Sequence, residues 1–416
     1  MNKVTYKTLR IGDIVQTVSF THKFNKDKLI AINTSDVCNG TMGAGTLTPI
    51  NKLKGQFKKT IQKGDILFSE IRPANRRFAK VSISDCQDFV VSTKLMVLRK
   101  FNDKVDANYF FYCLTNQPFL DTLQRRAENR IGSFPQITFD ILAGYTFPIP
   151  PLDEQKRIAK VIFNIDRKIE LNKAINDNLE AMAKQLYDYW FVQFDFPNEE
   201  GKPYKSSGGD MVWNEKLKRE IPKGWEVMPL KHWLDIKSGF AFKSETYLQD
   251  GTYKIITIKN VQDHHLETSG CDCINVIPNE IKDWCKLTIN DRLISLTGNC
   301  GRLCIVTENN LLLNQRVGLI DCEKYLLNYA YALLSSKEFQ TLCGNLAKGA
   351  AQANLSPIEL CKSLAQLPPK TIIKNFEKAM SSLIKKYIQC EIENKHLQKQ
   401  RDELLPLLMN GQLTIE

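Results

Sequence analysis

Two long stretches of the chain carry hydrophobic residues at alternating steps of four and three. The first runs from Ile158 to Trp190 and the second from Phe376 to Leu408. A four–three spacing kept over more than four heptads is typical of a coiled-coil seam. The predicted seam positions are Ile158, Ile162, Ile165, Ile169, Asn176, Leu179 and Leu186 in the first stretch and Phe376, Leu383, Tyr387, Asn394, Leu397 and Leu404 in the second. Each helix could instead pack on its own domain, but two matched seams favour pairing with each other.

An asparagine occupies the same position in both seams. Asn176 and Asn394 are related by the same sequence offset as the hydrophobic positions around them. A buried polar residue in a seam lowers stability but fixes the register of pairing. We therefore expect these two asparagines to specify how the helices pair.

Shorter patterns also occur twice, about half a chain apart. Residues 108–114 resemble 328–334 at an offset of 220, and residues 64–69 resemble 290–295 at an offset of 226. The double prolines before the long helices, at 150–151 and 368–369, match at an offset of 218. An offset that drifts slowly in one direction indicates a duplicated unit with small loop deletions. Two such units related by a pseudo-twofold axis would place their helices antiparallel.

Short β-branched and aromatic runs precede each long helix and predict strands, for example at 80–83 and 253–258. One or two helices are predicted after them, at 108–123 and 328–342. The expected fold is α+β, with two domains in a pseudo-twofold repeat joined by two long helices that form an antiparallel coiled coil. The expected boundaries are 1–150 for the first domain, 151–195 for the central helix, 196–221 for a connector, 222–368 for the second domain, and 369–416 for the last helix and tail.

Composition narrows the functional classes. A chain of 416 residues is too long for one hydrophobic core, and its net charge of +11 suggests an anionic partner. The first residues do not form a signal peptide, and no run of about 18 apolar residues predicts a membrane span. We therefore expect a cytoplasmic protein that contacts no membrane and whose 12 cysteines are reduced thiols.

Cysteines and histidines in the second half raise the question of a metal site. Cys271, Cys273, Cys285, Cys300 and Cys304 are spaced as C-x-C and C-x3-C, unlike the paired C-x2-C of common zinc sites. Free thiols are the favoured interpretation, and no metal is expected. The adjacent pair at 264–265 is expected to be an ordinary loop pair of histidines.

The motifs of two enzyme classes are missing from the sequence. No glycine-rich stretch is followed by Lys-Ser or Lys-Thr at phosphate-loop spacing. No Asn-Pro-Pro-Tyr or Asp-Pro-Pro-Tyr run of the amino-methyltransferase kind occurs either. We therefore expect a chain that is not an enzyme and binds no cofactor itself.

Four segments together resemble the specificity subunits of type I restriction–modification systems. They are the junction Pro-Ile-Pro-Pro-Leu-Asp-Glu-Gln-Lys-Arg-Ile-Ala at 148–159, Ile-Pro-Lys-Gly-Trp-Glu-Val at 221–227, Gly-Asp-Ile-Leu-Phe-Ser at 64–69, and the end at 404–411. Their order and spacing cover essentially the whole chain. The second junction, at 368–373, departs from the pattern because it lacks the Glu-Gln of the first. The last helix is therefore expected to contact its partner differently.

The resemblance implies a DNA-reading subunit. The domains at 1–150 and 222–368 would be target-recognition domains, and the two helices would be the spacer between them. The implied partners are double-stranded DNA, two methyltransferase subunits and two motor–nuclease subunits. S-adenosylmethionine, ATP and Mg would be bound by those partners. Because the two halves share a pattern but not a sequence, the target is expected to be split and asymmetric.

Candidate DNA contacts are loop positions where cations and amides gather, because arginine and lysine bind phosphates and guanine while asparagine and glutamine bind adenine. They are Arg72, Asn75, Arg76, Arg77, Lys80, Lys94, Arg125, Arg126 and Arg130 in the first half and Thr297, Asn299, Arg302, Asn314, Gln315, Arg316 and Lys348 in the second. The main alternative function is a two-domain protein-binding adaptor on a coiled-coil spacer. The repeat and the long helices fit that alternative equally well.

Overall fold

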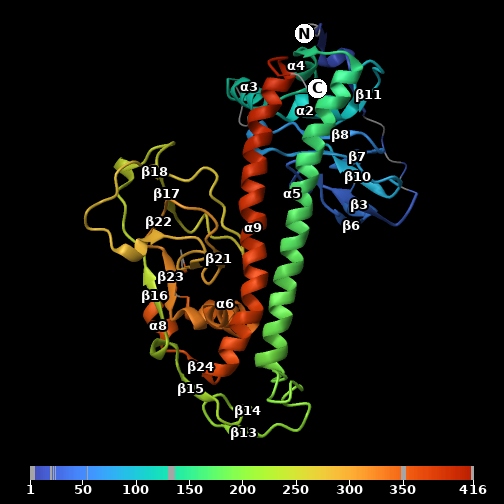
Figure 1. Ribbon diagram of the computed structural model, residues 1–416. Coiled ribbons are helices and arrows are strands. Elements are labelled where there is room, and N and C mark those ends of the chain that lie inside the picture. Colours follow the sequence, from blue (N-terminus) through green and yellow to red (C-terminus); the bar gives the residue numbers. More distant parts are fainter. Residues whose placement is uncertain are drawn as a thin grey trace. The chain divides into compact units, whose positions relative to one another are not determined.

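The computed structural model describes residues 5–18, 21, 23, 25–53, 55–129, 136–347 and 353–413. The chain divides into two compact units, Met1–Ile169 with His396–Glu416 (unit 1) and Glu170–Lys395 (unit 2). Their boundaries fall inside the two long helices, α5 (Leu152–Tyr187) and α9 (Lys370–Met409) (Figure 1). Each unit therefore contains one globular half and a part of each long helix.

Unit 1 holds two four-stranded sheets. One has the order β2 (Val15–Thr17), β11 (Leu95–Lys100), β8 (Ile66–Ser69) and β9 (Phe78–Lys80) and is antiparallel throughout. The other has the order β6 (Thr46–Pro49), β3 (Lys28–Ile32), β10 (Phe89–Ser92) and β7 (Phe57–Lys59), and β3 and β10 are parallel. Two smaller pairs are β1 (Lys7–Arg10) with β12 (Thr146–Ile149), and β4 (Val37–Cys38) with β5 (Thr41–Met42).

The helices of unit 1 are α1 (Ile50–Leu53), α2 (Ala107–Thr115), α3 (Gln117–Glu128), α4 (Phe139–Ala143) and the first part of α5. Two helices, α2 and α3, occupy the region predicted at 108–123. The chain turns at Asn116, whose side chain accepts a hydrogen bond from the Phe119 amide at 3.0 Å and so caps α3. Pro118, in the first turn of α3, fits this start because a helix leaves its first amides unpaired.

Unit 2 repeats this arrangement. One sheet has the order β16 (Leu234–Ser238), β23 (Val317–Cys322), β20 (Arg292–Ser295) and β21 (Leu303–Ile305). The other has the order β18 (Cys273–Ile274), β17 (Tyr253–Ile256), β22 (Leu311–Leu313) and β19 (Lys286–Leu287), and again its two middle strands are parallel. The smaller pairs are β15 (Glu226–Pro229) with β24 (Leu364–Leu367), and β13 (Met211–Asn214) with β14 (Arg219–Pro222) in the connector. The helices are α6 (Leu327–Ser335), α7 (Lys337–Leu346) and α8 (Pro357–Cys361), with parts of α5 and α9.

The matching strand orders confirm the duplication predicted from the sequence offsets. Each unit contains both α-helices and β-sheets, so the mixed class was also predicted correctly. The ends of individual strands were not predicted correctly. The strand predicted at 80–83 is β9, which ends at Lys80, and the strand predicted at 253–258 ends at Ile256.

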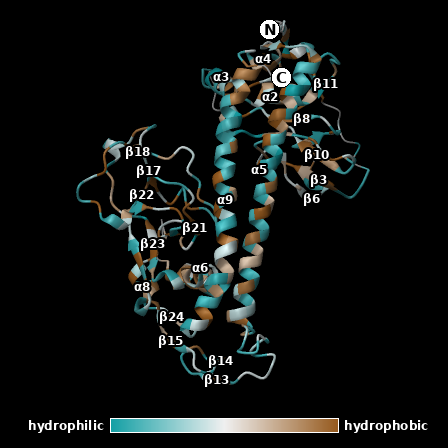
Figure 2. Cartoon of the chain, viewed as in Figure 1, coloured by the Kyte–Doolittle hydropathy of each residue, from teal (hydrophilic) through white to brown (hydrophobic). Residues whose placement is uncertain are grey.

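Within each unit, α5 and α9 contact each other and run in opposite directions. In unit 2, Asn172 Nδ2 donates to Glu393 Oε2 at 2.8 Å and Asn176 Nδ2 donates to Glu391 Oε1 at 2.7 Å. In unit 1, Arg401 Nη1 donates to Asp166 Oδ1 at 3.0 Å. Figure 2 shows hydrophobic positions interspersed with hydrophilic ones along both helices, as expected for amphipathic helices.

None of the predicted seam residues is fully exposed to solvent. Those that are buried are Ile158, Ile162, Ile169, Asn176, Phe376, Tyr387 and Asn394. Those that are half-buried are Ile165, Leu179, Leu186, Leu383, Leu397 and Leu404. Although α5 and α9 are long, no helix among the described residues is apolar enough over a sufficient length to cross a bilayer.

The two helix junctions are held in different ways, which explains their different sequences. Gln155 is buried, donates to the carbonyls of Lys104 (3.0 Å) and Pro150 (2.8 Å), and accepts from the Asp106 amide (2.7 Å). Its counterpart at the offset of the double prolines is Ile373, which is buried in the core of unit 2. Hydrogen bonds therefore dock the start of α5, whereas apolar packing docks the start of α9.

Candidate nucleic-acid interface

Several loops of unit 1 converge on the segment that follows β8. The Glu70 amide donates to the Lys94 carbonyl at 3.1 Å, which joins this segment to the turn between β10 and β11. The Ala74 amide donates to Gln124 Oε1 of α3 at 3.0 Å. The Ile137 amide donates to the Glu70 carbonyl at 2.8 Å. Candidate residues that are far apart in sequence are thus brought into one region.

Unit 2 builds the same constellation after β20. The Leu296 amide donates to the Arg316 carbonyl at 3.0 Å, and the Leu355 amide donates to the Leu296 carbonyl at 2.8 Å. Gln340 of α7 donates to the Gly301 carbonyl at 2.9 Å. Leu296 and Arg316 are the repeat counterparts of Glu70 and Lys94, so both units arrange these loops in one way.

Two amide side chains in these constellations were missed by the sequence analysis. Gln136 forms a strand-like bridge with Ile71, and its Nε2 donates to Glu70 Oε2 at 2.9 Å. Asn354 forms the corresponding bridge with Thr297. These two amides are related by the same sequence offset as the double prolines. That shared offset is the sequence signal that could have identified them.

The loop after β8 contains two arginines in a left-handed backbone conformation. Arg72 has a φ of 47° and Arg76 a φ of 52°, on either side of a single 3-10 turn at Pro73–Asn75. Such conformations cost free energy in residues other than glycine and are often found at functional sites. The bond of the Ala74 amide to Gln124 ties this part of the backbone to α3.

Five of the candidate contacts in unit 1 are exposed to solvent. They are Arg72, Asn75, Lys94, Arg125 and Arg126. The first two lie in the left-handed loop, Lys94 lies in the turn that contacts Glu70, and the last two lie on α3 beside Gln124. All five side chains therefore lie at the surface of unit 1.

Three other candidates of unit 1 bind protein groups instead. Arg76 Nε donates to Asn39 Oδ1 at 2.6 Å, and its guanidinium lies 5.5 Å from the centre of the Phe78 ring. Arg77 Nη1 donates to the Ser35 carbonyl at 3.2 Å, and Lys80 Nζ donates to Asn108 Oδ1. Burial lowers the pKa of both Arg76 and Lys80. In this structure, these cations are engaged in holding loops of unit 1.

The candidates of unit 2 divide in the same way. Thr297 and Asn314 are buried and bind protein groups. Thr297 Oγ1 donates to Asn354 Oδ1 at 2.8 Å, and Asn314 Oδ1 accepts from the Arg316 amide at 3.2 Å. Arg302 is half-buried and donates to Gln262 Oε1 at 3.0 Å. The exposed candidates are Asn299, Gln315 and Arg316. Arg130 and Lys348, which the sequence also proposed, lie outside the described residues.

The cysteines and histidines of unit 2 have structural environments. Cys271, Cys273, Cys285 and Cys304 are buried, and burial raises the pKa of Cys271 to about 11. His264 Nδ1 lies 3.0 Å from the Tyr331 hydroxyl, and His265 Nδ1 lies 3.1 Å from Glu391 Oε2. Within the described part of the chain, no group of three or more His, Cys, Asp or Glu side chains could hold a metal ion.

This chain resembles known proteins in sequence. The family model of the type I restriction modification DNA specificity domain matches twice, at residues 3–181 and 222–400. The specificity subunit of the type I restriction enzyme HindI from Haemophilus influenzae is 29% identical over 98% of this chain and 99% of its own length. The MjaIX specificity subunit from Methanocaldococcus jannaschii is 28% identical over 76% of this chain and 71% of its own.

A solved structure shares the fold. It is the type I restriction–modification S subunit from M. genitalium, with a TM-score of 0.54 and 15% identity over 98% of this chain and 97% of that chain. The two matches to the family model cover both globular halves and most of both long helices. The chain therefore belongs to the family of type I restriction–modification DNA specificity subunits.

Proposed function

We propose that this chain is the non-catalytic DNA-reading subunit of a cytoplasmic type I restriction–modification complex and recognises a split, asymmetric target. The observation that carries the proposal is the loop constellation built in the same way in both units. Where these loops meet, unit 1 exposes the cations Arg72, Lys94, Arg125 and Arg126, and unit 2 exposes the cation Arg316. Arginine and lysine there would bind phosphates, while the exposed amides Asn75, Asn299 and Gln315 are candidates for contacts to base edges.

The two long helices would form the spacer between the two reading domains. We propose that α5 and α9 pair as an antiparallel coiled coil. Support comes from the opposite directions of α5 and α9 within each unit and from the seam residues, which are all buried or half-buried. The distance between the two DNA half-sites would then depend on the length of this pair.

Catalysis would belong to the partners, which we propose to be two methyltransferase subunits and two motor–nuclease subunits. They would bind S-adenosylmethionine, ATP and Mg. Unit 2 offers an apolar stripe for a protein partner, made of Leu171, Ile175 and Met182 on α5 and Tyr189 in the helical turn that follows α5, which are 37–52% exposed. Exposed apolar stripes of this kind mark protein interfaces. On α9, the residues at the corresponding repeat positions are Gln389, Glu393, Gln400 and Leu407. Three of these four are polar, so the two helices present chemically different faces.

The test of DNA reading is a binding experiment on the chain assembled with its methyltransferase subunits. We expect selection from a random DNA library to yield two conserved blocks separated by an unconserved spacer. The affinity should fall steeply with added salt, because counterions are released from each phosphate contact. A protein-binding adaptor would instead select no sequence, and its complex would show no DNA-dependent salt slope.

The seam asparagines should respond differently to substitution. Asn176→Leu removes the bond to buried Glu391 and should lower the free energy of unfolding by about 2 kcal/mol. Asn394→Leu should be neutral or stabilising by about 1 kcal/mol, since the buried Asn394 side chain, unlike that of Asn176, has no hydrogen bond to lose among the described residues. Urea unfolding followed by tryptophan fluorescence measures both. Equal losses in the two variants would contradict this account of the seam.

A further inference from the structure

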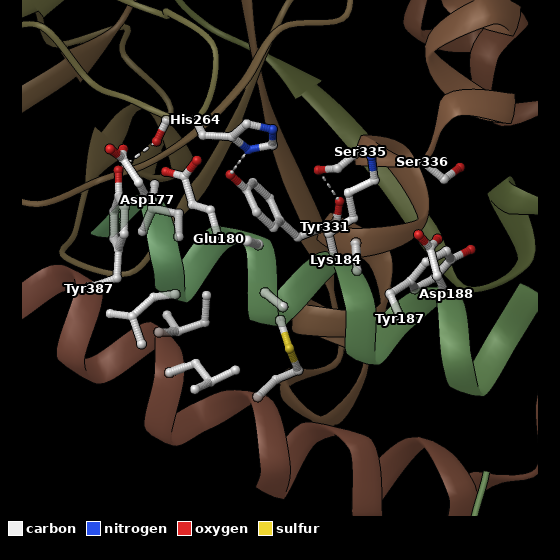
Figure 3. Close-up of a pocket in the computed structure, with 18 residues that line it drawn as sticks. Asp177, Glu180, Lys184, Tyr187, Asp188, His264, Tyr331, Ser335, Ser336 and Tyr387 are labelled. Atoms are coloured by element: carbon white, nitrogen blue, oxygen red, sulfur yellow. Dashed lines mark hydrogen bonds between the residues drawn. The ribbon is translucent and has the colours of Figure 1, made fainter. Parts of the chain in front are cut away.

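A cavity of about 360 Å³ lies in unit 2, where α5, α6 and α9 meet the loop that carries His264 (Figure 3). All of its lining residues fall between 177 and 387, so the cavity lies within one compact unit. Its volume is in the range of pockets that hold small molecules. None of the candidate DNA contacts lines it, so it is a separate feature of the fold.

The walls are mainly hydrocarbon. The apolar lining residues are Leu179, Ala181 and Ala183 of α5, Ile305 of β21, Ala332 of α6, and Met380, Leu383 and Ile384 of α9. Three tyrosines add their rings, and two of the hydroxyls are already engaged: that of Tyr331 with His264 Nδ1, and that of Tyr387 with the His264 carbonyl at 2.6 Å. The walls therefore suit an apolar body and offer it aromatic faces.

One carboxylate in this wall lacks a partner. Among the described residues, the Glu180 carboxylate forms no hydrogen bond or ion pair. Burial, followed by the nearby charges of Asp177 and Glu391, raises the pKa of Glu180 to about 7, and the nearby charge of His265 opposes part of this rise. Glu180 is half-buried, and partial burial of a carboxylate that forms no hydrogen bond is unfavourable, so a cation beside it would offset that cost.

The remaining charges around the cavity also favour a cation. Asp177 and Asp188 line it with Glu180, whereas Lys184 is the one lysine or arginine among its lining residues. Lys184 is a turn away from Glu180 on α5 but forms no ion pair with it. Figure 3 shows Glu180 at the end of the cavity near His264 and Tyr387, with Asp188 toward the other end.

We propose that this cavity binds a small primary amine with an apolar body about the size of a phenyl ring. The ammonium group would donate to Glu180, and the ring would lie between the tyrosines and the apolar residues of α9. An anion would be repelled by the three carboxylates, and a neutral molecule would leave Glu180 without a partner. A bound amine would link α5, α6, α9 and the His264 loop in one contact.

The test uses phenethylamine and its neutral analogue 2-phenylethanol as probes on the full chain without DNA. Isothermal titration should show that phenethylamine binds at least about tenfold more tightly, as expected for a charge-assisted hydrogen bond. Glu180→Gln keeps the shape of the side chain but removes its charge, so it should abolish this preference. Glu199→Gln, at an exposed position in the connector, is the matched control and should keep it.

Two more variants test the placement of the ligand. Ala332→Leu should fill the cavity and weaken the binding of both probes, whereas Lys184→Met should tighten the binding of phenethylamine by removing a competing cation. Equal affinity for the two probes, or no binding of phenethylamine at millimolar concentration, would overturn the proposal. The comparison of the two probes uses the unmodified chain, so it tests the proposal even if a variant fails to fold. A preference that survives Glu180→Gln would also overturn it.

Discussion

Replacing Arg72, Lys94, Arg125 and Arg126 together with alanine is expected to weaken DNA binding by about a thousandfold at about 0.15 M salt. Each phosphate contact contributes about 0.9 to the slope of log K against log salt, so the loss of four contacts should reduce the slope by about 3.6. All four side chains are exposed, so their removal leaves no buried group without a partner. A fluorescence-anisotropy titration of the assembled methyltransferase at several salt concentrations measures the slope.

The control for this variant removes the same charge elsewhere. Lys202, Lys205 and Lys216 lie exposed in the connector and Lys223 lies exposed directly after it, all outside both loop constellations. Their replacement with alanine should leave the slope nearly unchanged. If the two variants weakened binding equally, net charge and not the loop constellation would account for the affinity, and the proposed interface would be wrong.

Replacing Arg292 with methionine is expected to lower the free energy of unfolding of unit 2 by about 3 kcal/mol. Arg292 is fully buried, its Nη2 donates to Asn328 Oδ1 at 2.9 Å, and Asn328 Nδ2 donates to Glu377 Oε1 at 2.9 Å. Removing one member of a buried network leaves the others without their partners, which costs more than the net value of the bonds. The guanidinium also lies 5.3 Å from the centre of the Tyr331 ring, and that contact is lost as well.

Tryptophan fluorescence makes this measurement specific to one unit. All five tryptophans of the chain fall between residues 190 and 284, within unit 2. Arg316→Met, at an exposed position, should change the free energy of unfolding by less than about 0.5 kcal/mol. Arg292→Met combined with Glu377→Gln should recover part of the loss, because the carboxylate left behind is neutralised. A full-sized loss in the exposed control, or none in Arg292→Met, would refute this account of the network.

The sequence predicted the architecture well because the chain carries its pattern twice. Offsets between 218 and 226 matched the segments that the structure places in equivalent strands and helices. The four–three spacing located both long helices, since burial on one face of a helix leaves a strong periodic signal. The sequence pattern did not separate α2 from α3. Asn116 followed by Pro118 is nevertheless a signal for the start of α3, and it could have marked the end of α2.

The individual contacts were harder to predict because their partners are distant in sequence. Arg76 and Arg77 have the same residue type and neighbourhood as exposed Arg72, yet they turn toward Asn39 and Ser35, which lie far earlier in the chain. Arg292 shows the opposite difficulty. Its counterpart at an offset of 226 is Ile66, so the repeat gives no indication of a buried arginine in β20. Local sequence identifies loop cations, and only the tertiary fold separates inward from outward ones.

The central claim is that each globular half reads its own part of the target. The most direct measurement exchanges residues 1–148 for the matching domain of a related specificity subunit and maps the methylated sites in a host that has no other source of that methylation. The account predicts that one block of the target changes to that of the donor while the other block and the spacer length stay the same. A change in both blocks, or in neither while the exchanged chain folds and assembles, would contradict it.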